Sequence, residues 1–325
     1  MTHPLNFARE RLDKIGEPGG YALILNLHAI ELPMLQVTSA MKIRRARPEE
    51  AEELHHVLEW SRGPDVWVNP YETVSKPTPH ESGHTTEFFS LAHADFRYHV
   101  LEFAGTNQCV HEIVMASTLT SQDLEAGPTF LHGGGASSLA SGPVIQRFLG
   151  EVAFEQAEFV TLTAADVADL AHVYQKLLEH NNGIVNLHGA VNDYIALRMI
   201  PKQSSLRLLG LFAILESLLT HPPDPKDPYD SITRQVKQKI ALLNKRFERP
   251  LPYAEHFQKL KPETAWTKLY ALRSDLAHGA RADFAHKFSA LGNMENAFRF
   301  VQIATKAVMR RALEEAPLMA DLRDC

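Results

Sequence analysis

The chain has 325 residues, enough for about two domains, and its composition of 45% hydrophobic and 22% charged residues is that of a globular protein. This composition excludes a coiled-coil rod, a collagen-like chain and a disordered chain as descriptions of the whole. No stretch approaches the ~20 apolar residues of a membrane-spanning helix, and the first residues lack the features of a signal peptide. The two cysteines, Cys109 and Cys325, cannot build a disulfide framework or a cysteine zinc cluster, so we expect a cytoplasmic protein.

Charge is distributed unevenly along the chain, whose net charge is −6. Residues 1–199 carry 13 basic and 25 acidic side chains, whereas residues 200–325 carry 20 and 14. This surplus of positive charge favours contact between the C-terminal part and a nucleic acid. Basic solvated surfaces are also common on proteins that bind no nucleic acid, so charge alone leaves both interpretations open.

The first part of the chain, residues 1–160, is predicted to be a mixed α+β domain. Strand-forming or alternating residues predict strands at Tyr21–Ile30, Phe96–Phe103, Val110–Leu119 and Val144–Phe159. A helix is predicted at Pro48–Trp60, because proline suits the first turn and acidic residues there suit the helix dipole. Clusters of Pro or Gly predict loops at 61–86 and 132–142. We expect this domain to sense a ligand, bind a regulatory partner or position RNA.

The remainder, residues 161–325, is predicted to be an all-α bundle of about six helices. Thr163 and Asp166 have the spacing of a capping box that opens a helix ending near Glu179. Apolar residues at helical spacing predict further helices over 184–200, 204–220, 230–247 and 262–279, and a long last helix beginning near 294. The 204–220 helix is apolar nearly all round and should be central.

Glu216 is the only charged residue between Leu208 and Leu219 of this central helix. A buried carboxylate is costly unless it is paired or hydrogen-bonded, so we expect a cation from another helix. The alternative is that Glu216 lies at the rim of the helix and faces water.

The 262–279 helix offers Arg273, followed by His278 in its last turn. A histidine that titrates near neutrality can move the proton of a ribose 2′-hydroxyl or of the leaving group. An arginine can hold the scissile phosphate through two hydrogen bonds. Alternatively, Arg273 pairs with Asp275 or Glu216, and His278 only caps the helix.

The spacing of Arg273 and His278 is not decisive, since Arg281 and His286 have the same spacing. A five-residue offset also separates two side chains by about 140° on a straight helix. The pair would converge only through a local distortion or across a dimer interface.

The residues around this pair carry a family resemblance. The segment Leu269-Tyr-x-Leu-Arg-Ser-x-Leu-Ala-His-Gly279, preceded by Phe212-Ala-Ile-Leu-Glu-Ser-Leu-Leu219, resembles the HEPN superfamily, and most closely its Apea-like branch. The resemblance covers roughly residues 161–325 and includes Val236-Lys-Gln-Lys-Ile-Ala-Leu-Leu243. It implies a helical bundle that dimerises and joins two Arg…His motifs in one cleft. Family members often have Asn, Asp or His after the arginine, whereas this chain has Ser274.

The resemblance implies a metal-independent endoribonuclease of a toxin, abortive-infection or antiphage system. Arg273 and His278 would be the catalytic pair and Glu216 an orienting acid, with no metal and no other cofactor. Cleavage through the 2′-hydroxyl would leave a 2′,3′-cyclic phosphate. The expected RNA contacts are Ser274, Lys237, Lys245, Arg246 and Lys268. Because some members of the superfamily do not cut, the alternative is a non-catalytic module that binds RNA, nucleotides or a protein partner.

Three other features point elsewhere. His80-Glu-Ser-Gly-His84 matches a zinc-protease pattern, but this pattern needs a helix, which Pro77, Pro79 and Gly83 oppose. His55 and His56, beside Glu52 and Glu53, are interpreted as the solvated side of a surface helix. Trp266 and Tyr270 could stack on bases, although their place beside a core stripe favours a packing role.

Overall fold

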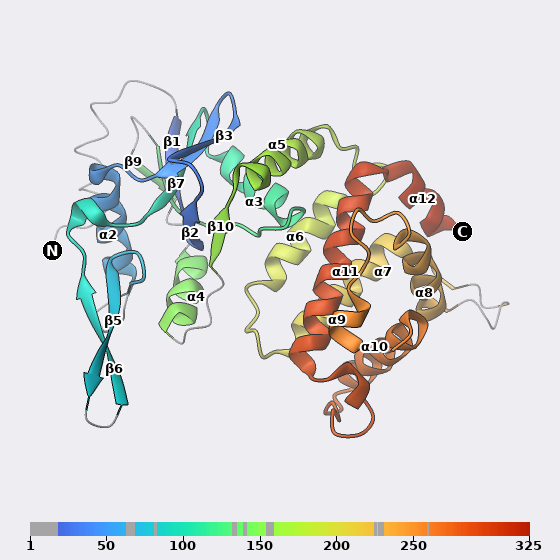
Figure 1. Cartoon of the computed structure of the whole chain (residues 1–325). Coiled ribbons are helices and arrows are strands. Elements are labelled where there is room, and N and C mark those ends of the chain that lie inside the picture. Colours follow the sequence, from blue (N-terminus) through green and yellow to red (C-terminus); the bar gives the residue numbers. More distant parts are fainter. Residues whose placement is uncertain are drawn as a thin grey trace. The chain divides into compact units, whose positions relative to one another are not determined.

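The computed structural model describes residues 19–62, 69–80, 83–131, 135–138, 142–153, 159–223, 226, 231–258 and 260–325. The chain divides into two compact units, Met1–Tyr174 and Gln175–Cys325. The division falls within helix α5 (Ala164–Glu179), whereas the boundary expected from the sequence, after residue 160, lies ahead of this helix. Each unit is described by itself (Figure 1).

The N-terminal unit is built on an antiparallel sheet. Among the described residues, six strands form this sheet in the order β3-β4-β7-β1-β8-β9. Their bounds are β1 Gly19–Ile24, β3 Met34–Thr38, β4 Met41–Arg45, β7 His99–Ala104, β8 Ala126–Leu131 and β9 Gly135–Ser138. Every pairing between neighbours in this order is antiparallel. The first strand, β1, lies between β7 and β8, so strands far apart in the sequence belong to one hydrogen-bonded layer.

Two further pairs of strands lie outside this sheet. Strand β2 (Leu27–Ile30) pairs in parallel with β10 (Val160–Leu162), just ahead of α5. Strands β5 (Thr73–His80) and β6 (Gly83–Ser90) pair in antiparallel register and form a ribbon that projects from the rest of the unit (Figure 1). A short 3-10 helix, η1 (His93–Asp95), follows this ribbon.

The core of the N-terminal unit lies between the sheet and two helices, α2 (Pro48–Arg62) and α4 (Gly142–Ala153). The two helices contact each other, and α4 also contacts β8. Tyr21 and Phe130 from neighbouring strands stack with ring centroids 4.9 Å apart, and Leu54 and Phe148 supply the helical side of the same core. This layered packing confirms that the N-terminal part is an α+β region.

The structure corrects several element predictions in this unit. The predicted strand at Val110–Leu119 is helix α3 (Gln108–Thr118), and the first part of Val144–Phe159 belongs to helix α4. In both cases burial follows the helical period, for example at Ile145, Phe148 and Leu149, and the preference of β-branched residues for strands did not decide the structure.

The predicted loops also contain strands. Residues 61–86 include β5 and the start of β6, and residues 132–142 include β9. Pro77 and Pro79 lie two positions apart in β5. Backbone nitrogens two residues apart face the same edge of a strand, so both prolines lack an N–H group on the same edge of β5. A two-stranded ribbon leaves one edge of each strand without a partner strand, and proline is tolerated on such an edge.

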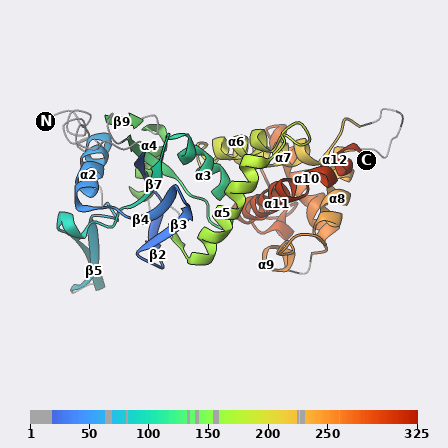
Figure 2. The ribbon, with the colours of Figure 1, turned by 90° about the horizontal axis from the view of Figure 1, so that it is seen from above.

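The C-terminal unit is helical. Its elements after α5 are α6 Leu187–Leu197, α7 Ser205–Leu219, α8 Ile232–Leu243, α9 Tyr253–Phe257, α10 Pro262–Ala277, η2 Ser289–Leu291, α11 Met294–Glu314 and α12 Ala316–Asp324. Helix α7 contacts α6, α8, α10, α11 and α12, and it runs alongside α11 (Figures 1 and 2). The predicted central position of α7 is therefore confirmed.

Local sequence signals explain where these helices begin and how closely they pack. The capping box predicted for α5 is present, with Thr163 and Asp166 hydrogen-bonded to each other through side chain and backbone. Ser204 caps the N-terminus of α7, where its side chain accepts a hydrogen bond from the Leu206 N–H. Gly210 lies further along α7, and a Cβ atom at this position would lie 2.2 Å from Leu197 Cδ2. The absence of a side chain at Gly210 thus lets α6 and α7 approach closely. Within the described part of the chain, no helix has both the length and the apolar character needed to cross a membrane.

Phe300 on α11 tests the packing of this bundle. Its side chain is fully buried, with ring centroids 4.7 Å from Phe257, 4.9 Å from Tyr253 and 5.8 Å from Trp266. We expect Phe300→Ala to lower the free energy of unfolding by about 3–5 kcal/mol, because it removes a large buried ring and leaves a cavity. The matched control, Ile303→Ala on the same helix, removes an exposed side chain and should cost less than about 1 kcal/mol in urea unfolding followed by circular dichroism. Equal losses for the two variants would contradict the packing described.

His99 on β7 makes the stability of the N-terminal unit depend on pH. Burial lowers the pKa of His99 to about 4, although its ring contacts the carbonyl oxygen of Leu27 at 3.3 Å. Since the unfolded chain binds this proton near pH 6.5, the unfolded state is favoured as pH falls from 6.5 to 4, by up to about 3 kcal/mol. Urea unfolding at several pH values should show this loss, and His99→Gln, which does not titrate, should reduce it. An unchanged profile in His99→Gln would contradict the assignment.

Candidate active site

Helix α10 carries the predicted catalytic pair. Proline at its first turn begins the helix, and His278 closes it as the C-cap, with φ of −90° and ψ of 8°. Gly279 follows with φ of +77°, a left-handed conformation that glycine adopts without strain. The helix therefore ends between Arg273 and Gly279 as the sequence predicted, and His278 is the C-cap that follows its last residue, Ala277.

One face of α10 is packed into the bundle. Trp266 and Tyr270 are buried, and the Trp266 Nε1–H donates to the Tyr253 hydroxyl at 2.8 Å. The Tyr270 ring meets that of Phe212 on α7 edge-on, with centroids 5.0 Å apart. The suggestion that Trp266 and Tyr270 stack on bases is therefore wrong, because both rings are used in packing.

Glu216 on α7 and Arg273 on α10 form an ion pair. Arg273 Nη2 lies 3.2 Å from Glu216 Oε2, and the side chains are 38% and 15% exposed, respectively. This meets the expectation that Glu216 obtains a cation from another helix, and it excludes the alternative in which Glu216 faces water alone. Asp275 is not the partner of Arg273, because its carboxylate binds Lys287 Nζ at 2.7 and 2.8 Å.

Two buried polar atoms lie close to this ion pair. Glu216 Oε1 and the Tyr270 hydroxyl are both shielded from solvent, and neither has a hydrogen-bond partner among the described residues. Burial raises the pKa of Tyr270 far above its usual value, the negative charge of Glu216 raises it further, and the charge of Arg273 opposes this effect. Tyr270 thus stays a neutral phenol close to Glu216. The cation that stabilises the charge of Glu216 is Arg273.

His278 has a different environment. Its side chain is exposed, its backbone N–H donates to Ser274 O at 3.1 Å, and its ring has no hydrogen bond within the described ranges. Ser274, the residue that follows Arg273, is also exposed. The end of α10 therefore presents a half-exposed guanidinium, a hydroxyl and an imidazole to solvent, which are groups that can bind and protonate a phosphate ester.

The predicted RNA-contact residues fall into two places. Lys237 Nζ on α8 donates to Thr267 Oγ1 on α10 at 2.8 Å, and Lys268 Nζ on α10 donates to Lys287 O at 3.2 Å. Both lysines therefore lie beside α10, on which Arg273 and His278 are carried.

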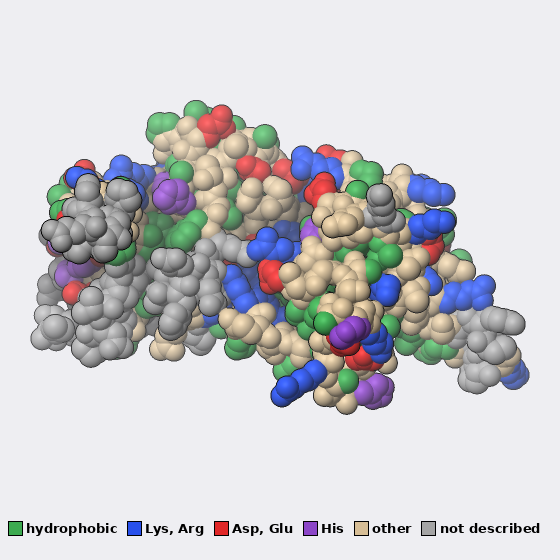
Figure 3. All heavy atoms as spheres, turned by 60° about the horizontal axis from the view of Figure 1, so that its bottom comes forward, with side chains coloured by type: hydrophobic (Ala, Val, Ile, Leu, Met, Phe, Trp, Pro, Cys, Tyr) green, Lys and Arg blue, Asp and Glu red, His purple; other side chains and the backbone are tan. Residues whose placement is uncertain are grey.

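Lys245 and Arg246 follow the C-terminus of α8, in a second place. Arg246 Nη2 lies 2.9 Å from Glu315 Oε1, between α11 and α12, and this pairing raises the pKa of Arg246. On the face shown in Figure 3, Lys and Arg side chains occur in separate groups with Asp and Glu among them. Within the described part of the chain, the ion pair of Arg246 is with Glu315, and no hydrogen bond or ion pair joins Lys245 or Arg246 to Lys237 or Lys268.

The zinc-protease pattern is not realised. His80 ends β5 and His84 lies in β6, with His84 opposite Pro79 in the register of the ribbon. The zinc-protease pattern needs both histidines on one helix, whereas here they belong to two paired strands, so the interpretation of His80 and His84 as zinc-protease ligands is wrong.

The family relationship stays a prediction, because comparisons with models of known protein families, with curated proteins and with solved structures find no match to this chain.

Sequence reasoning missed two features of the site. Lys287 neutralises Asp275 from a segment between α10 and α11, and no local spacing pattern connects two residues so far apart. Tyr270 was considered only as a packing or stacking residue, whereas its hydroxyl lies buried beside the charge of Glu216. In the sequence, Tyr270 precedes Arg273 by three residues, an offset that places both side chains on one side of α10.

The ion pair between Glu216 and Arg273 can be measured by a double-mutant cycle. We expect a coupling of about 0.5–1 kcal/mol that decreases with salt, because Arg273 is partly exposed. Arg273→Gln alone should cost more than Arg273→Gln combined with Glu216→Gln, since the single variant leaves a mostly buried carboxylate unpaired. Urea unfolding of the four proteins at low and high salt measures the coupling, and additive costs would show that the two side chains do not interact.

Proposed function

We propose that this protein is a metal-independent endoribonuclease of the HEPN type that acts as a homodimer. The observation that carries the proposal is the ion pair with Glu216, which holds Arg273 in place while leaving it partly exposed at the same end of α10 as the exposed His278. A guanidinium that is fixed but accessible, and an imidazole not engaged by the described fold, are suited to cleaving a phosphodiester without a metal.

The chemistry assigns one role to each side chain. His278 takes the proton of the 2′-hydroxyl or gives a proton to the departing 5′-oxygen. The hydroxyl oxygen then attacks the adjacent phosphorus and the bond to the 5′-oxygen breaks, which leaves a 2′,3′-cyclic phosphate and a 5′-hydroxyl. Arg273 uses Nη2 for Glu216, and its other N–H groups are directed to the phosphate oxygens. Glu216 acts as an orienting residue.

A second copy of the chain completes the proposed site. The five-residue offset places the two side chains about 140° apart along α10, and His278 lies at the cap where the helix ends. Two such helix ends that meet across a dimer axis bring arginine and histidine from different chains around one linkage. Lys237, Lys268 and Ser274, which lie on or beside α10, then contact the RNA backbone.

The biological role follows from the activity. An RNA-cutting enzyme of this kind is suited to a toxin, abortive-infection or antiphage effector in the cytoplasm, where its substrate is found. Such an enzyme needs control, and we assign this task to the α+β unit, through a regulatory partner or ligand.

Cleavage of mixed RNA by the full chain in excess chelator tests the proposal. We expect His278→Ala to lower the rate by at least about 100-fold, because general acid–base catalysis by one histidine is worth about that much or more. Arg273→Lys, which keeps the charge but loses the bidentate geometry, should also be impaired. The products should carry 2′,3′-cyclic phosphate ends.

The chain offers a matched control for this experiment. Arg281 and His286 have the same spacing as the proposed pair, but His286 is highly exposed and pairs with Asp283. His286→Ala should therefore cut RNA at the wild-type rate. Equal cutting by wild type and His278→Ala, or no cutting by a folded wild-type dimer, would overturn the nuclease proposal.

A second candidate function is a non-catalytic module that binds RNA, a nucleotide or a protein partner. The observation that favours it is that Arg273 already has a structural task, since it neutralises the mostly buried Glu216. This candidate predicts that labelled RNA binds with an affinity that falls steeply with salt and remains uncut.

A further inference from the structure

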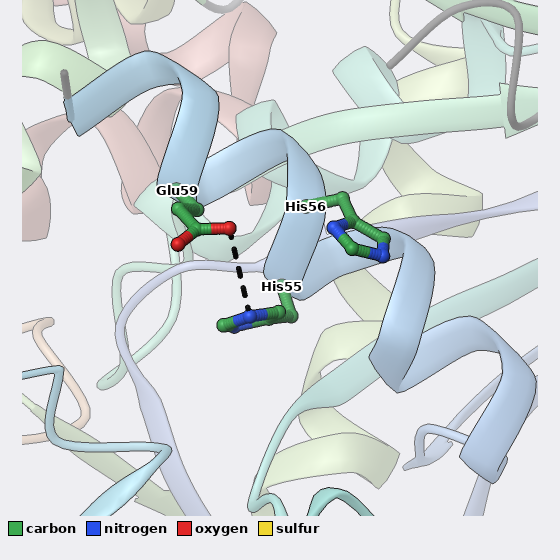
Figure 4. A group of neighbouring side chains, drawn as sticks. All are labelled: His55, His56 and Glu59. Carbon is green, nitrogen blue, oxygen red and sulfur yellow. Dashed lines mark ion pairs between the residues drawn. The ribbon is translucent and has the colours of Figure 1, made fainter. Parts of the chain in front are cut away.

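A second cluster of titratable side chains lies in the N-terminal unit, on the surface of α2. The side chains of His55, His56 and Glu59 each place one possible ligand atom within 4.8 Å of the others. Figure 4 shows the Glu59 carboxylate bent toward the His55 ring, with His56 beside them on the same helix. The prediction of a solvated helix side does not hold for the neighbouring Glu53, which is buried and accepts a hydrogen bond from the Tyr21 hydroxyl.

The helical spacing explains why the three side chains converge. Glu59 follows His55 by four residues and His56 by three, the two offsets at which helical side chains are neighbours. At about 100° per residue, Glu59 projects from a direction between those of the two histidines. The Glu59 carboxylate can therefore bind the same metal ion as the His55 and His56 imidazoles.

Glu72 fixes the orientation of the His55 ring. The Glu72 Oε1 atom lies 2.8 Å from His55 Nδ1, and the same atom accepts a hydrogen bond from the buried Tyr98 hydroxyl, which in turn accepts one from Asn69. An ionised carboxylate can only accept, so Nδ1 carries the hydrogen and the lone pair of neutral His55 is on Nε2. Nε2 is the atom that faces Glu59, at 3.8 Å from Oε2.

This arrangement is the one that metal-ligating histidines use. A ligating imidazole donates its other N–H to a carboxylate, which sets the tautomer and makes the ligand more basic. Here Glu72 is largely buried and is itself held by Tyr98, so it orients His55 before any metal arrives. The largely buried Glu72 thus holds His55 Nδ1, and His55 Nε2 is left facing the Glu59 carboxylate, an arrangement that a solvated helix surface does not require.

We propose that His55 Nε2, a ring nitrogen of His56 and the Glu59 carboxylate bind one zinc ion. Two imidazoles and one carboxylate are a common zinc ligand set, and a fourth position is left open for water. Ligand atoms in a tetrahedral zinc site are ~3.3 Å apart, so no two of the three ligand atoms need to close by more than about 1.5 Å. Glu59 is half exposed and can make this movement by rotating its side chain.

His93 lies next to this proposed site. Its ring centroid is 5.3 Å from that of His55 and 4.9 Å from that of Phe96. His93 is exposed on η1, whereas the three ligands come from α2. His93 is therefore a neighbour of His55 from a separate element, and it is not one of the three proposed ligands.

Zinc binding to the full-length, untagged chain tests the proposal. Competition against a colorimetric zinc chelator should give one tightly bound zinc ion per chain. His56→Gln and Glu59→Gln should each weaken this binding at least tenfold, because each removes one of three ligands. His55→Gln should do the same, and circular dichroism shows whether each variant is folded. Cobalt(II) in place of zinc should give the visible spectrum of a low-coordinate nitrogen and oxygen site without thiolate bands, which separates this site from Cys109 and Cys325.

Two matched controls separate the proposed site from weak surface binding. Glu49→Gln is the same type of substitution as Glu59→Gln, made at another exposed position of α2. His111→Gln replaces an exposed histidine of α3. Both variants should bind zinc as the wild type does. The proposal is overturned if the wild type binds no zinc more tightly than a histidine peptide does, or if His56→Gln and Glu59→Gln bind as tightly as the controls. This result is independent of RNA cleavage, which is measured in chelator.

Discussion

The ion pair between Glu216 and Arg273 is the constraint on which the helical unit and its proposed chemistry both depend. Helix α7 contacts five other helices of the bundle, and α10 supplies the cation that offsets the cost of a mostly buried carboxylate there. The contact is made by the helix that buries Tyr270 and leaves Ser274 and His278 on the surface. Stability and proposed function are therefore coupled through one guanidinium.

The N-terminal unit follows a similar principle in another setting. Its polar side chains are organised by a buried chain of hydrogen bonds from Asn69 through Tyr98 and Glu72 to His55. Such a network rigidifies the packing only when its members are satisfied, and here it ends on an imidazole at the surface of α2. The N-terminal unit thus fixes the orientation of the His55 imidazole, as the helical unit fixes the orientation of the Arg273 side chain.

The sequence predicted helices better than strands, for a physical reason. Helices such as α5, α7 and α10 are encoded by caps and by burial at a local period, and both signals lie within one segment. Strands β5, β6 and β9 depend on hydrogen bonds to another segment, which a local pattern does not contain. Helices α3 and α4 contain β-branched residues that favour strands locally, but the burial of their side chains follows the helical period.

For the candidate sites, the sequence by itself determined the residue types: a lone carboxylate on an apolar helix, an Arg and a His near the end of a later helix, and paired histidines on α2. Only the tertiary structure decided the partners, because Glu216 and Arg273, Asp275 and Lys287, and His55 and Glu72 come from different segments. Charge pairing across a fold depends on helix rotation and on which segments the core brings together. These are properties of the packed chain, and no spacing along the sequence encodes them.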